Sequence, residues 1–492
     1  MNQAKSDMQR TEPDEDRTEP NDDRTEPDDD RTEPDVLADR DTETPDYNDH
    51  FDAVVIGAGL AGSAAALTMA EAGLDVVMIE RGRYPGAKNV FGGVLYTPTI
   101  REIADLDDAP LERYIAERRY GVLTDRDETA ISLRPGEWHE PPHNDSYTVL
   151  RGEFDRWFAD QAVEAGATLV TETTVTGLVR DGEERGAGAG NSHIVGVETD
   201  RPDGTLRAPY IVLAEGGNSL VSEGAGLKPR EDRENVAVAV KEVLEFPGDE
   251  DAIRDRFRLS GDAGAAYHYF GEGAVGDAFG GGFVYTNDDT VSVGVAYRLS
   301  DAATSQPDPE GTLNAFKTHP AVAPLLRGAR TVEYTAKTIP EGGIASVPEL
   351  AHDGAVIVGD AAGLVLNNGV HLEGTNMAVE SGYHAGRAIA EAAAADRTDA
   401  AALSAYGDAL EASFVVRNLR RYDWLMEAAE TDRELFFGEL PRALADAGTE
   451  YFRIDRESKE AHAENAKQRL LEAVGGYTGA ARLALRYRKL FT

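Results

Sequence analysis

The chain contains no cysteine among its 492 residues. Disulfide bonds, thiolate metal sites and cysteine-ligated iron–sulfur clusters are therefore excluded within it. It also lacks any uninterrupted apolar run of about 18 residues, which predicts that no helix crosses a membrane. The N-terminus has no basic stretch followed by an apolar one, the pattern of a signal peptide, so we expect a cytoplasmic protein.

Basic residues are scarce, because 49 Lys and Arg face 90 Asp and Glu, for a net charge of -41 at pH 7. The first 50 residues hold 19 acidic and 6 basic residues, so most of the negative charge belongs to the remaining chain. This balance disfavours nucleic-acid binding, which requires Lys and Arg to neutralise phosphates. It is typical of proteins from salt-loving organisms, where molar salt shortens the Debye length to about 3 Å and damps self-repulsion.

A seven-residue repeat occupies much of the N-terminal segment. Its units are RTEPDED, RTEPNDD, RTEPDDD and RTEPDVL, and they begin at Arg10, Arg17, Arg24 and Arg31. Every unit contains a proline and the first three contain no apolar residue, so the period does not indicate a coiled coil. We expect residues 1–50 to form a disordered acidic tail. An acidic docking arm is the alternative interpretation.

An apolar strand leads into a glycine-rich turn at residues 57–62, GAGLAG, and a helix-like stretch follows. This GxGxxG pattern is typical of a dinucleotide-binding turn. Gly57 allows the tight turn, Gly59 lets a pyrophosphate approach the backbone, and Gly62 lets the helix pack closely on the strand. The N–H groups at the helix N-terminus suit phosphate oxygens. Glu80 ends the next apolar run, 18 residues beyond Gly62, and is placed to accept hydrogen bonds from a ribose.

A second signature lies far along the chain, where the apolar run at 354–358 ends in Gly359-Asp360. An aspartate at this point can accept hydrogen bonds from a sugar-alcohol chain. The helix expected to begin near Gly374 can direct its N–H groups at negative charge on a reduced flavin. Two such separated features suit FAD better than NAD, because FAD has a second long half to hold. The sequence therefore predicts FAD as the cofactor.

The secondary-structure pattern predicts an α/β protein with an inserted antiparallel sheet. We expect a discontinuous nucleotide-binding domain at residues 51–225 and 336–395, a β-rich domain at 226–335 and a helical region at 396–492. The nucleotide-binding domain should hold a helix at 154–166 and a strand at 168–178. Runs typical of strands lie in the β-rich domain and at its border, at residues 236–245, 282–286, 291–297 and 331–337.

The two signatures together resemble those of glutathione-reductase-type FAD proteins, which have a Rossmann-like FAD-binding domain. Several further strings resemble the FixC family, close relatives of the electron-transfer-flavoprotein:quinone oxidoreductases. They are GAKN at 86–89 with Gly92-Gly93, VAVAVKEV at 236–243, GGFVYT at 281–286, PEGG at 340–343, Asn367-Asn368, HLEGTN at 371–376, and Ser413-Phe414 with Arg420-Arg421-Tyr422. The resemblance covers roughly residues 51–425.

The resemblance adds roles to the glycine turn. It implies that Arg151 approaches FAD from the following helix, that Val175 meets the adenine through its backbone, and that Gly374 faces the isoalloxazine ring. No metal site is expected. The full set of expected FAD-binding residues is Gly57, Ala58, Gly59, Leu60, Ala61, Gly62, Glu80, Arg81, Gly92, Gly93, Arg151, Val175, Gly359, Asp360, Gly374, Thr375 and Asn376.

The resemblance implies an oxidoreductase that takes electrons from an electron-transfer flavoprotein and delivers them to a quinone. Any iron–sulfur cluster must lie in a separate ferredoxin-like partner, because the chain has no cysteine. His371 and Glu373 are the candidate catalytic residues, with a structural role in their loop as the alternative. Lys241 and Glu242 should point to opposite faces of a strand, and a solvated ion pair is the favoured interpretation. Lys88 could offset negative charge on reduced FAD.

Two other functions stay open. A geranylgeranyl-reductase-like enzyme would saturate isoprenoid double bonds, but the Tyr-x-Trp-x-Phe-Pro stretch usual in those enzymes is missing from residues 282–286. A non-catalytic FAD-binding scaffold would not need the flavin-facing loop at 367–376. Cations beside apolar residues at 482–491 could contact the inner face of a membrane or a partner, or could simply cap the last helix.

Overall fold

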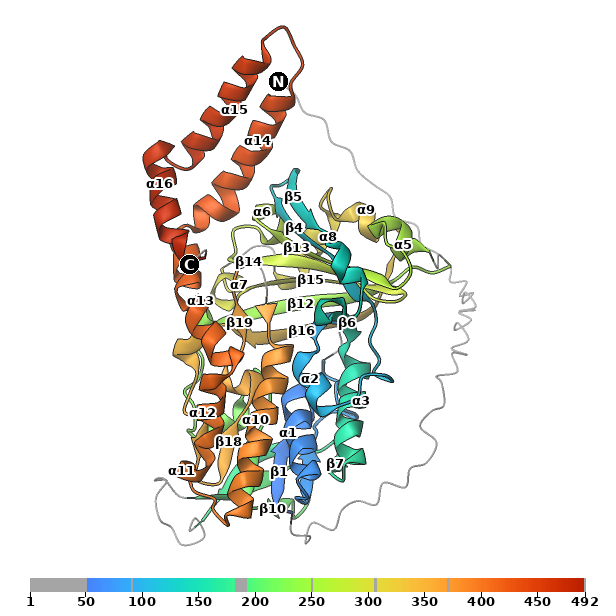
Figure 1. Ribbon diagram of the computed structural model, residues 1–492, viewed down its shortest axis with the longest axis vertical. Coiled ribbons are helices and arrows are strands. Elements are labelled where there is room, and N and C mark those ends of the chain that lie inside the picture. The colour runs from blue at the N-terminus through green and yellow to red at the C-terminus, as the bar shows by residue number, and fades with distance from the viewer. Residues whose placement is uncertain are drawn as a thin grey trace, which may run out of the picture. The chain divides into compact units, whose positions relative to one another are not determined.

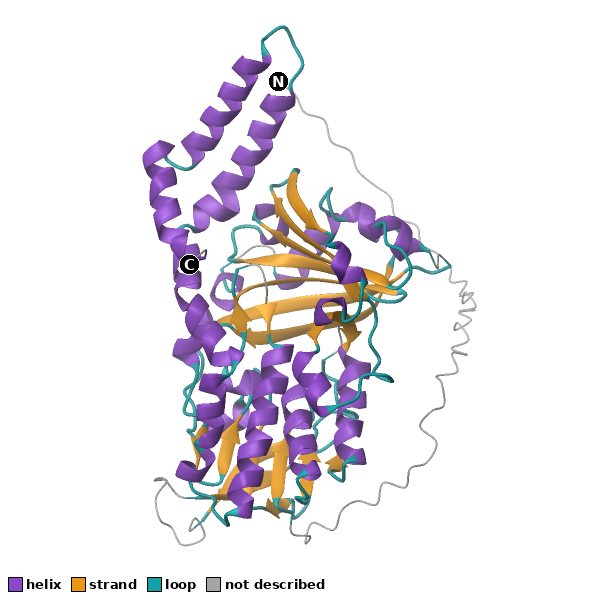
Figure 2. Ribbon diagram, viewed as in Figure 1, coloured by secondary structure: helices purple, strands orange, loops and turns teal. Residues whose placement is uncertain are grey.

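The computed structural model describes residues 51–89, 92–181, 193–248, 251–304, 308–369 and 372–490. The predicted tail at 1–50 and the candidate catalytic residue His371 lie outside these residues. Strands and helices alternate in the first part and helices dominate the last, so the predicted α/β class is confirmed (Figure 2).

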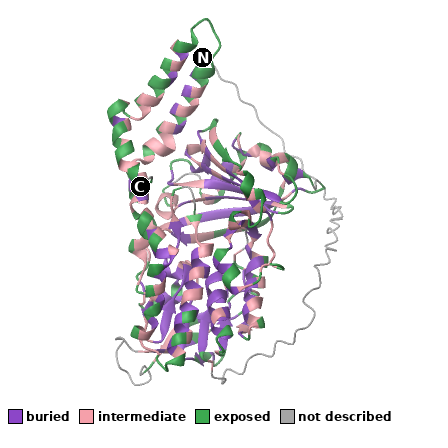
Figure 3. Ribbon diagram, in the orientation of Figure 1, coloured by how far each residue is buried: buried purple, intermediate pink, exposed green. Residues whose placement is uncertain are grey.

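A six-stranded sheet runs in the order β17-β18-β11-β1-β2-β7. Its inner strands are parallel, and only the edge strand β17 is antiparallel to its neighbour. Parallel strands are covered on both faces, which explains their uninterrupted apolar runs and their burial in Figure 3. The strands are β1 (Ala53–Ile56), β2 (Val76–Ile79), β7 (Thr168–Val170), β11 (Tyr210–Leu213), β17 (Ala351–His352) and β18 (Ala355–Ile357).

Helices α1 (Leu60–Glu71), α3 (Arg151–Glu164) and α10 (Thr375–Ala394) lie side by side on one face of this sheet (Figure 1). Helices α1 and α10 pack backbone to backbone. A Cβ atom on Gly382 would lie 2.1 Å from the Ala61 carbonyl oxygen, and one on Gly386 would lie 2.8 Å from the Ala65 oxygen. This pairing runs in the same direction along both helices, so their N-termini point toward the same end of the sheet.

The predicted strand at 168–178 is wrong as one element. It is two strands, β7 in the parallel sheet and β8 (Val175–Arg180) in a separate three-stranded sheet with β9 (Ile194–Thr199) and β10 (Thr205–Arg207). The chain breaks between them where Glu172 takes a left-handed φ of 52°. A local pattern of apolar residues does not reveal such a break, because both halves have strand propensity.

A nine-stranded sheet has the order β16-β12-β15-β14-β13-β4-β6-β3, with β5 paired to β4. Each strand predicted between 236 and 337 is present. The sheet also takes strands from residues 92–150, so it extends beyond the predicted β-rich range, whose boundaries stay predictions. Its strands are β3 (Gly92–Tyr96), β4 (Tyr114–Leu123), β5 (Glu128–Leu133), β6 (Ser146–Leu150), β12 (Val236–Glu245), β13 (Ala263–Phe270), β14 (Gly280–Thr286), β15 (Thr290–Arg298) and β16 (Arg330–Pro340).

The last part of the chain is helical, as predicted. Its main helices are α12 (Ala405–Ala412), α13 (Phe414–Thr431), α14 (Leu440–Phe452), α15 (Lys459–Ala473) and α16 (Gly476–Arg486). Shorter elements are α2 (Pro98–Ile103), α4 (Leu220–Gly224), α5 (Ala252–Phe257), α6 (Glu272–Val275), α7 (Leu299–Ala302), α8 (Pro309–Thr318), α9 (Ala323–Leu326), α11 (Ala400–Leu403), β19 (Leu366–Asn367) and β20 (Leu372–Glu373). Within the described ranges, no helix has both the length and the apolar character needed to cross a membrane.

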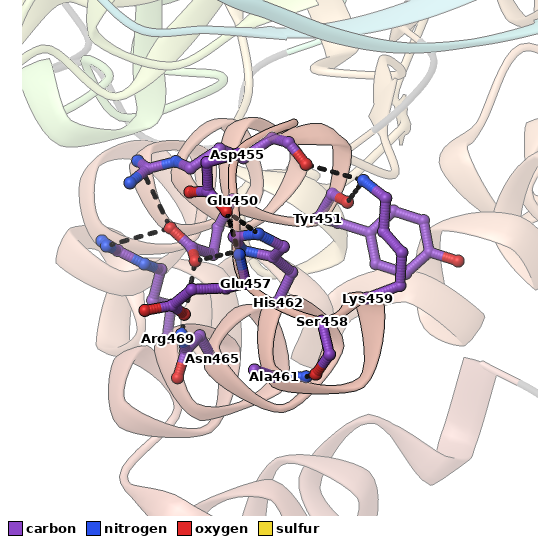
Figure 4. Close-up of polar contacts among 11 residues, drawn as sticks. Glu450, Tyr451, Asp455, Glu457, Ser458, Lys459, Ala461, His462, Asn465 and Arg469 are labelled. Carbon is purple, nitrogen blue, oxygen red and sulfur yellow. Dashed lines mark hydrogen bonds and ion pairs between the residues drawn. The ribbon is translucent and has the colours of Figure 1, made fainter.

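Helices α14 and α15 form a hairpin tied by a buried histidine. His462 lies between two carboxylates, with Nδ1 3.0 Å from Glu450 Oε1 and Nε2 3.0 Å from Asp455 Oδ1 (Figure 4). The Glu450 hydrogen bond is the main cause that raises the pKa of His462 above its usual value. The imidazolium form therefore holds the turn of the hairpin together.

Candidate functional site

A cavity of about 1080 Å³ lies between the two larger sheets. One wall consists of the turns that follow β1, β2, β11 and β18, at the carboxyl ends of the parallel strands. The other wall is the inner face of the nine-stranded sheet, and side chains from α13 and α16 complete the lining. Ligands of open α/β sheets bind at the carboxyl ends of strands, so this cavity is the candidate site.

The turn after β1 has the backbone geometry that the glycine pattern predicts. Gly57 has a φ of 97°, and a Cβ on it would lie 2.6 Å from the Ala214 carbonyl oxygen. A Cβ on Gly62 would lie 1.9 Å from the Gly57 oxygen, whereas one on Gly59 would meet nothing within 4 Å. Gly59 lines the cavity, so the backbone is open to a ligand at this residue.

Glu80 lies at the edge of the same turn, just after β2. It is 9% exposed, its Oε2 accepts a hydrogen bond from the Ala58 N–H at 3.2 Å, and its Oε1 accepts one from the Gly82 N–H at 2.7 Å. These bonds fix the carboxylate against the glycine turn while it still lines the cavity. Its neighbour Arg81 lines the cavity as well.

Arg151 enters the cavity from the first turn of α3. Its Nε and Nη2 atoms donate to Asp155 at 2.7 and 3.0 Å, and Asn89 Nδ2 donates to the same carboxylate at 3.2 Å. A Cβ on Gly86 would lie 2.7 Å from the Arg151 carbonyl oxygen, so the loop before β3 packs directly on this helix start. The ion pair therefore holds a guanidinium at the cavity wall in a fixed orientation.

Asp360 lies just after β18, and its carboxylate faces the start of α10. A Cβ on Gly374 would lie 3.8 Å from Asp360 Oδ1, and both residues line the cavity together with Thr375. Glu373 does not line it, because its Oε2 accepts a hydrogen bond from Asn376 Nδ2 at 2.9 Å beside the helix start. This contact favours the structural alternative for Glu373.

The structure brings most of the predicted residues to one cavity. Those that line it are Gly57, Gly59, Leu60, Ala61, Glu80, Arg81, Gly93, Arg151, Val175, Asp360, Gly374 and Thr375. The predicted residues Ala58, Gly62, Gly359, Glu373 and Asn376 do not line it. His371 lies outside the described residues.

Two lysines that the sequence did not single out for the site face the cavity from the nine-stranded sheet. Lys241 is 9% exposed, its Nζ lies 5.2 Å from the centre of the Phe283 ring, and Lys337 extends from the neighbouring strand β16. Burial, followed by the charges of Lys337 and Arg151, lowers the pKa of Lys241 well below its usual value. Three cations thus lie close enough to influence one another.

The predicted solvated ion pair of Lys241 and Glu242 is wrong, although the two side chains do point to opposite faces of β12. Glu242 is buried on the far face, where it pairs with Lys317 at 2.5 Å and accepts from Thr331 Oγ1 at 2.9 Å. The apolar run VAVAVKEV around the pair was the signal that both sides of this strand are covered.

The end of the cavity near the C-terminal helices is apolar. Its lining side chains here are Phe279, Leu425, Met426, Ala429, Phe436, Phe437, Leu483, Ala484, Tyr487 and Leu490. Sequence reasoning missed them, because helical periodicity does not tell which face meets a remote cavity.

The C-terminal helix α16 and the turn after it are docked on α13. Arg486 pairs with Asp432, and the Tyr487 hydroxyl donates to the Ala428 carbonyl oxygen at 2.9 Å. Arg421 Nη2 donates to the Lys489 carbonyl oxygen at 2.6 Å. These contacts engage part of the predicted basic surface with the protein itself.

Comparisons with known proteins agree with this geometry. Residues 50–254 match the family model of an FAD binding domain, residues 238–339 match "ETF-QO, ubiquinone-binding", and residues 425–491 match the ETF-QO/FixC family C-terminal domain. The chain is 41% identical to Protein FixC of Bradyrhizobium diazoefficiens, over 83% of this chain and 91% of that protein. It is 40% identical to the probable electron transfer flavoprotein-quinone oxidoreductase YdiS of Escherichia coli, over 83% and 92%.

Solved structures share the fold at lower identity. A geranylgeranyl bacteriochlorophyll reductase-like protein from Thermoplasma acidophilum superposes with a TM-score of 0.63 at 18% identity, covering 89% of this chain and 98% of that one. The flavin-dependent brominase Bmp2 superposes with a TM-score of 0.56 at 19% identity, covering 85% and 98%. At these identities the likeness shows the fold alone.

Proposed function

The chain belongs to the ETF-QO/FixC family of FAD-dependent oxidoreductases, and on this premise we propose that it transfers electrons from an electron-transfer flavoprotein to a quinone. The observation that carries the proposal is that the lining of one cavity changes from polar to apolar along its length. Glycine turns and charged side chains line one end, and apolar side chains from the C-terminal helices line the other. Such a site can hold a charged dinucleotide and an apolar acceptor together.

The residues of the polar end fit FAD. The N–H groups in the first turn of a helix have no intrahelical partner, and those of α1 begin at the open Gly59 position. Among the described residues, five Lys and Arg side chains line the cavity (Arg81, Lys88, Arg151, Lys241 and Lys337). Four Asp and Glu side chains of the described part line it as well (Glu80, Glu215, Glu341 and Asp360). This balance contrasts with the net charge of -41 and suits a pyrophosphate.

The acids near the glycine turn are already hydrogen-bonded. Glu80 accepts from two N–H groups, and Glu215 accepts from the N–H groups of Val221 and Ser222 at 2.7 Å each. They therefore offer ordered acceptors for ribose hydroxyls while repelling phosphate less than free carboxylates would. We propose that Glu80 holds the adenosine ribose and that Asp360 holds the flavin side chain near the start of α10.

Bound FAD supplies the chemistry, because its ring accepts and releases one or two electrons. The protein's own part is to orient the ring and keep water away. Phe283 and Tyr285 on β14 and the start of α10 border the middle of the cavity. The apolar side chains of α13 and α16 would bind the quinone ring and exclude solvent from it.

We also propose a ferredoxin-like iron–sulfur partner and a peripheral contact with the membrane. A chain without cysteine cannot hold such a cluster on its own thiolates. Quinones dissolve in lipid, and the α14–α15 hairpin carries Phe452 at 76% and Ile454 at 89% exposure. Sedimentation with liposomes of anionic lipid, for the protein and for a Phe452→Ser/Ile454→Ser variant, tests the contact. Equal recovery of both would remove it.

The experiment that tests the function uses the FAD-loaded protein in two half-reactions. In stopped-flow absorbance measurements, a reduced electron-transfer flavoprotein should bleach the flavin, and NADPH should not. Decylubiquinone should then restore the oxidised spectrum. Reduction only by NADPH, or no reoxidation by the quinone, would overturn the proposal. Saturation of a geranylgeranyl lipid by the reduced protein would instead support the isoprenoid reductase alternative.

A further inference from the structure

Glu341 is a carboxyl group at the junction between the polar and apolar parts of the cavity. It follows directly on β16 and lines the cavity, and its backbone N–H donates to the Asn235 carbonyl oxygen at 2.7 Å. The side chain is hydrogen-bonded by Asn367 and lies near the charge of Arg298. The side-chain oxygen Oδ1 of Asn367 accepts from the Gly369 N–H at 2.9 Å, so the side-chain nitrogen Nδ2 is the donor available to Glu341.

Arg298 and the segment that carries Asn367 both lie against α13, the helix that carries part of the apolar lining. Arg298 pairs with Glu430 of α13 at 2.9 Å and lies 4.8 Å from the centre of the Phe279 ring. On the other side, a Cβ on Gly369 would lie 3.9 Å from Leu425 Cδ2 of the same helix. Glu341 is therefore held where the inner cavity meets the side chains that would bind the quinone.

The other three acids of the cavity lining have different surroundings. Glu80 and Glu215 each accept backbone N–H groups through both carboxylate oxygens. Asp360 lies within reach of the charges of Arg151, Lys241 and Lys337. Among the described residues, no backbone N–H donates to the Glu341 carboxyl. Burial is the dominant influence and raises the pKa of Glu341 to about 7, against the opposing effects of Asn367 and Arg298.

We propose that Glu341 is the proton donor to the quinone oxygen during reoxidation of the flavin. This proposal rests on the quinone reductase function proposed above and names a further catalytic residue for it. A general acid works best when it is protonated at the working pH and still gives its proton up readily. Its place beside the apolar lining brings the carboxyl to the end of the cavity where an apolar acceptor would bind.

Reduction of the quinone to the quinol needs two electrons and two protons, and Glu341 supplies one of the two protons. Bound FAD in its reduced form would supply two electrons and one proton to the quinone. The O–H bond of Glu341 breaks, an O–H bond forms on the second quinone oxygen, and the quinol leaves. The carboxylate that remains then takes a proton from water, so no further oxidant or reductant is needed.

The test separates proton transfer from electron transfer with two acceptors. Ferricyanide takes electrons without a proton, whereas decylubiquinone needs both. In stopped-flow reoxidation of the pre-reduced protein, Glu341→Gln should slow the quinone reaction about a hundredfold or more, within the usual range for a general acid. The rate with ferricyanide should stay unchanged. The wild-type quinone rate should fall as the pH rises through about 7, the pKa of Glu341, and the variant should lose this dependence.

Glu112→Gln is the matched control. Burial also raises the pKa of Glu112 to about 7, and its Oε2 accepts the Asp288 N–H at 2.7 Å, but the residue does not line the cavity. This variant should keep the wild-type rate and pH profile with both acceptors. Glu341→Asp retains a carboxyl group, so it should keep the pH dependence at a reduced rate. It tests the proposal also if Glu341→Gln fails to hold FAD.

The outcomes distinguish this inference from the function beneath it. Equal slowing with both acceptors would assign Glu341 to flavin binding, and an unchanged quinone rate would leave it no role in the step; either result overturns the inference. The wild-type protein could be reoxidised by ferricyanide and not by decylubiquinone. In that case the proposed function is wrong, and so is the proton-donor role that rests on it.

Discussion

The glycines of the first turn offer a sharp test of how the FAD site is built, because each tolerates a methyl group differently. Gly62→Ala would place its Cβ 1.9 Å from the Gly57 carbonyl oxygen, far inside van der Waals contact, and the opposing atom is backbone. Overpacking of this kind costs about 1–3 kcal/mol. We expect a loss of stability of that size and a loss of FAD, because helix α1 must move away from the turn.

Gly59→Ala should separate binding from folding. Its Cβ would meet no atom within 4 Å, so the free energy of unfolding of the apo-protein should change little. The methyl group would project where Gly59 lines the cavity and keep the pyrophosphate from the helix N-terminus. A lost hydrogen bond to a charged group is worth about 1.5–3 kcal/mol. We therefore expect FAD binding about 10- to 150-fold weaker.

Fluorescence titration with FAD and urea unfolding of the apo-protein measure the two effects. Gly407→Ala in helix α12 is the control, because a Cβ there also meets nothing within 4 Å and the residue does not line the cavity. It should stabilise the protein by up to about 1 kcal/mol and leave FAD binding unchanged. The reasoning fails if Gly59→Ala binds FAD like the wild type, or if Gly62→Ala is as stable as the control.

Three further changes test the charges. Arg151→Met should destabilise the protein by about 3–5 kcal/mol in urea unfolding, since it strands the buried Asp155 carboxylate, and adding Asp155→Leu should restore most of the loss. The lowered pKa of Lys241 means that the unfolded chain binds more protons, so apo-protein stability should rise with pH toward 10.5. Lys241→Met should flatten this rise in urea unfolding and weaken FAD binding, and an unaltered slope would contradict the assignment. The raised pKa of His462 gives stability that is present below its unfolded pKa of about 6.5 and lost as the pH rises through the folded value. The melting-temperature difference between wild type and His462→Gln should therefore shrink from pH 6 to pH 9.

Local sequence patterns predicted those elements whose structure depends on neighbouring residues in the chain. The turn at 57–62 needs glycine for its backbone geometry, and β12 appears as a run of alternating valines, so both stand at the predicted residues. Strand β13 was not predicted, because Ala263–Ala266 has low strand propensity and depends on its neighbours. Its parallel partner β4 lies more than a hundred residues earlier in the chain, and no pattern within either strand names the other.

The residues of the candidate site likewise divide into those that a local pattern could predict and those that depend on the fold. Gly59, Glu80 and Asp360 follow buried parallel strands, and the carboxyl ends of such strands meet at one edge of a sheet, so the sequence could place them together. Lys241 was misread because lysine in a strand usually faces water, and only the fold shows that an internal cavity lies on that side. Tyr487 lines the cavity through the docking of α16 on α13, which depends on side chains far apart in sequence.

Cation placement in the cavity couples cofactor binding to stability. The chain has 49 basic residues against 90 acidic ones, yet Lys241, Lys337 and Arg151 face one internal space and influence one another electrostatically. Burial lowers the pKa of both lysines, so the empty cavity holds its amines at a free-energy cost. A ligand carrying two phosphates removes part of that cost on binding, which lowers its Kd. At a hundredfold excess over the Kd, binding stabilises the folded protein by about 2.7 kcal/mol in total. The two lysines that destabilise the empty protein therefore favour the folded state that binds FAD.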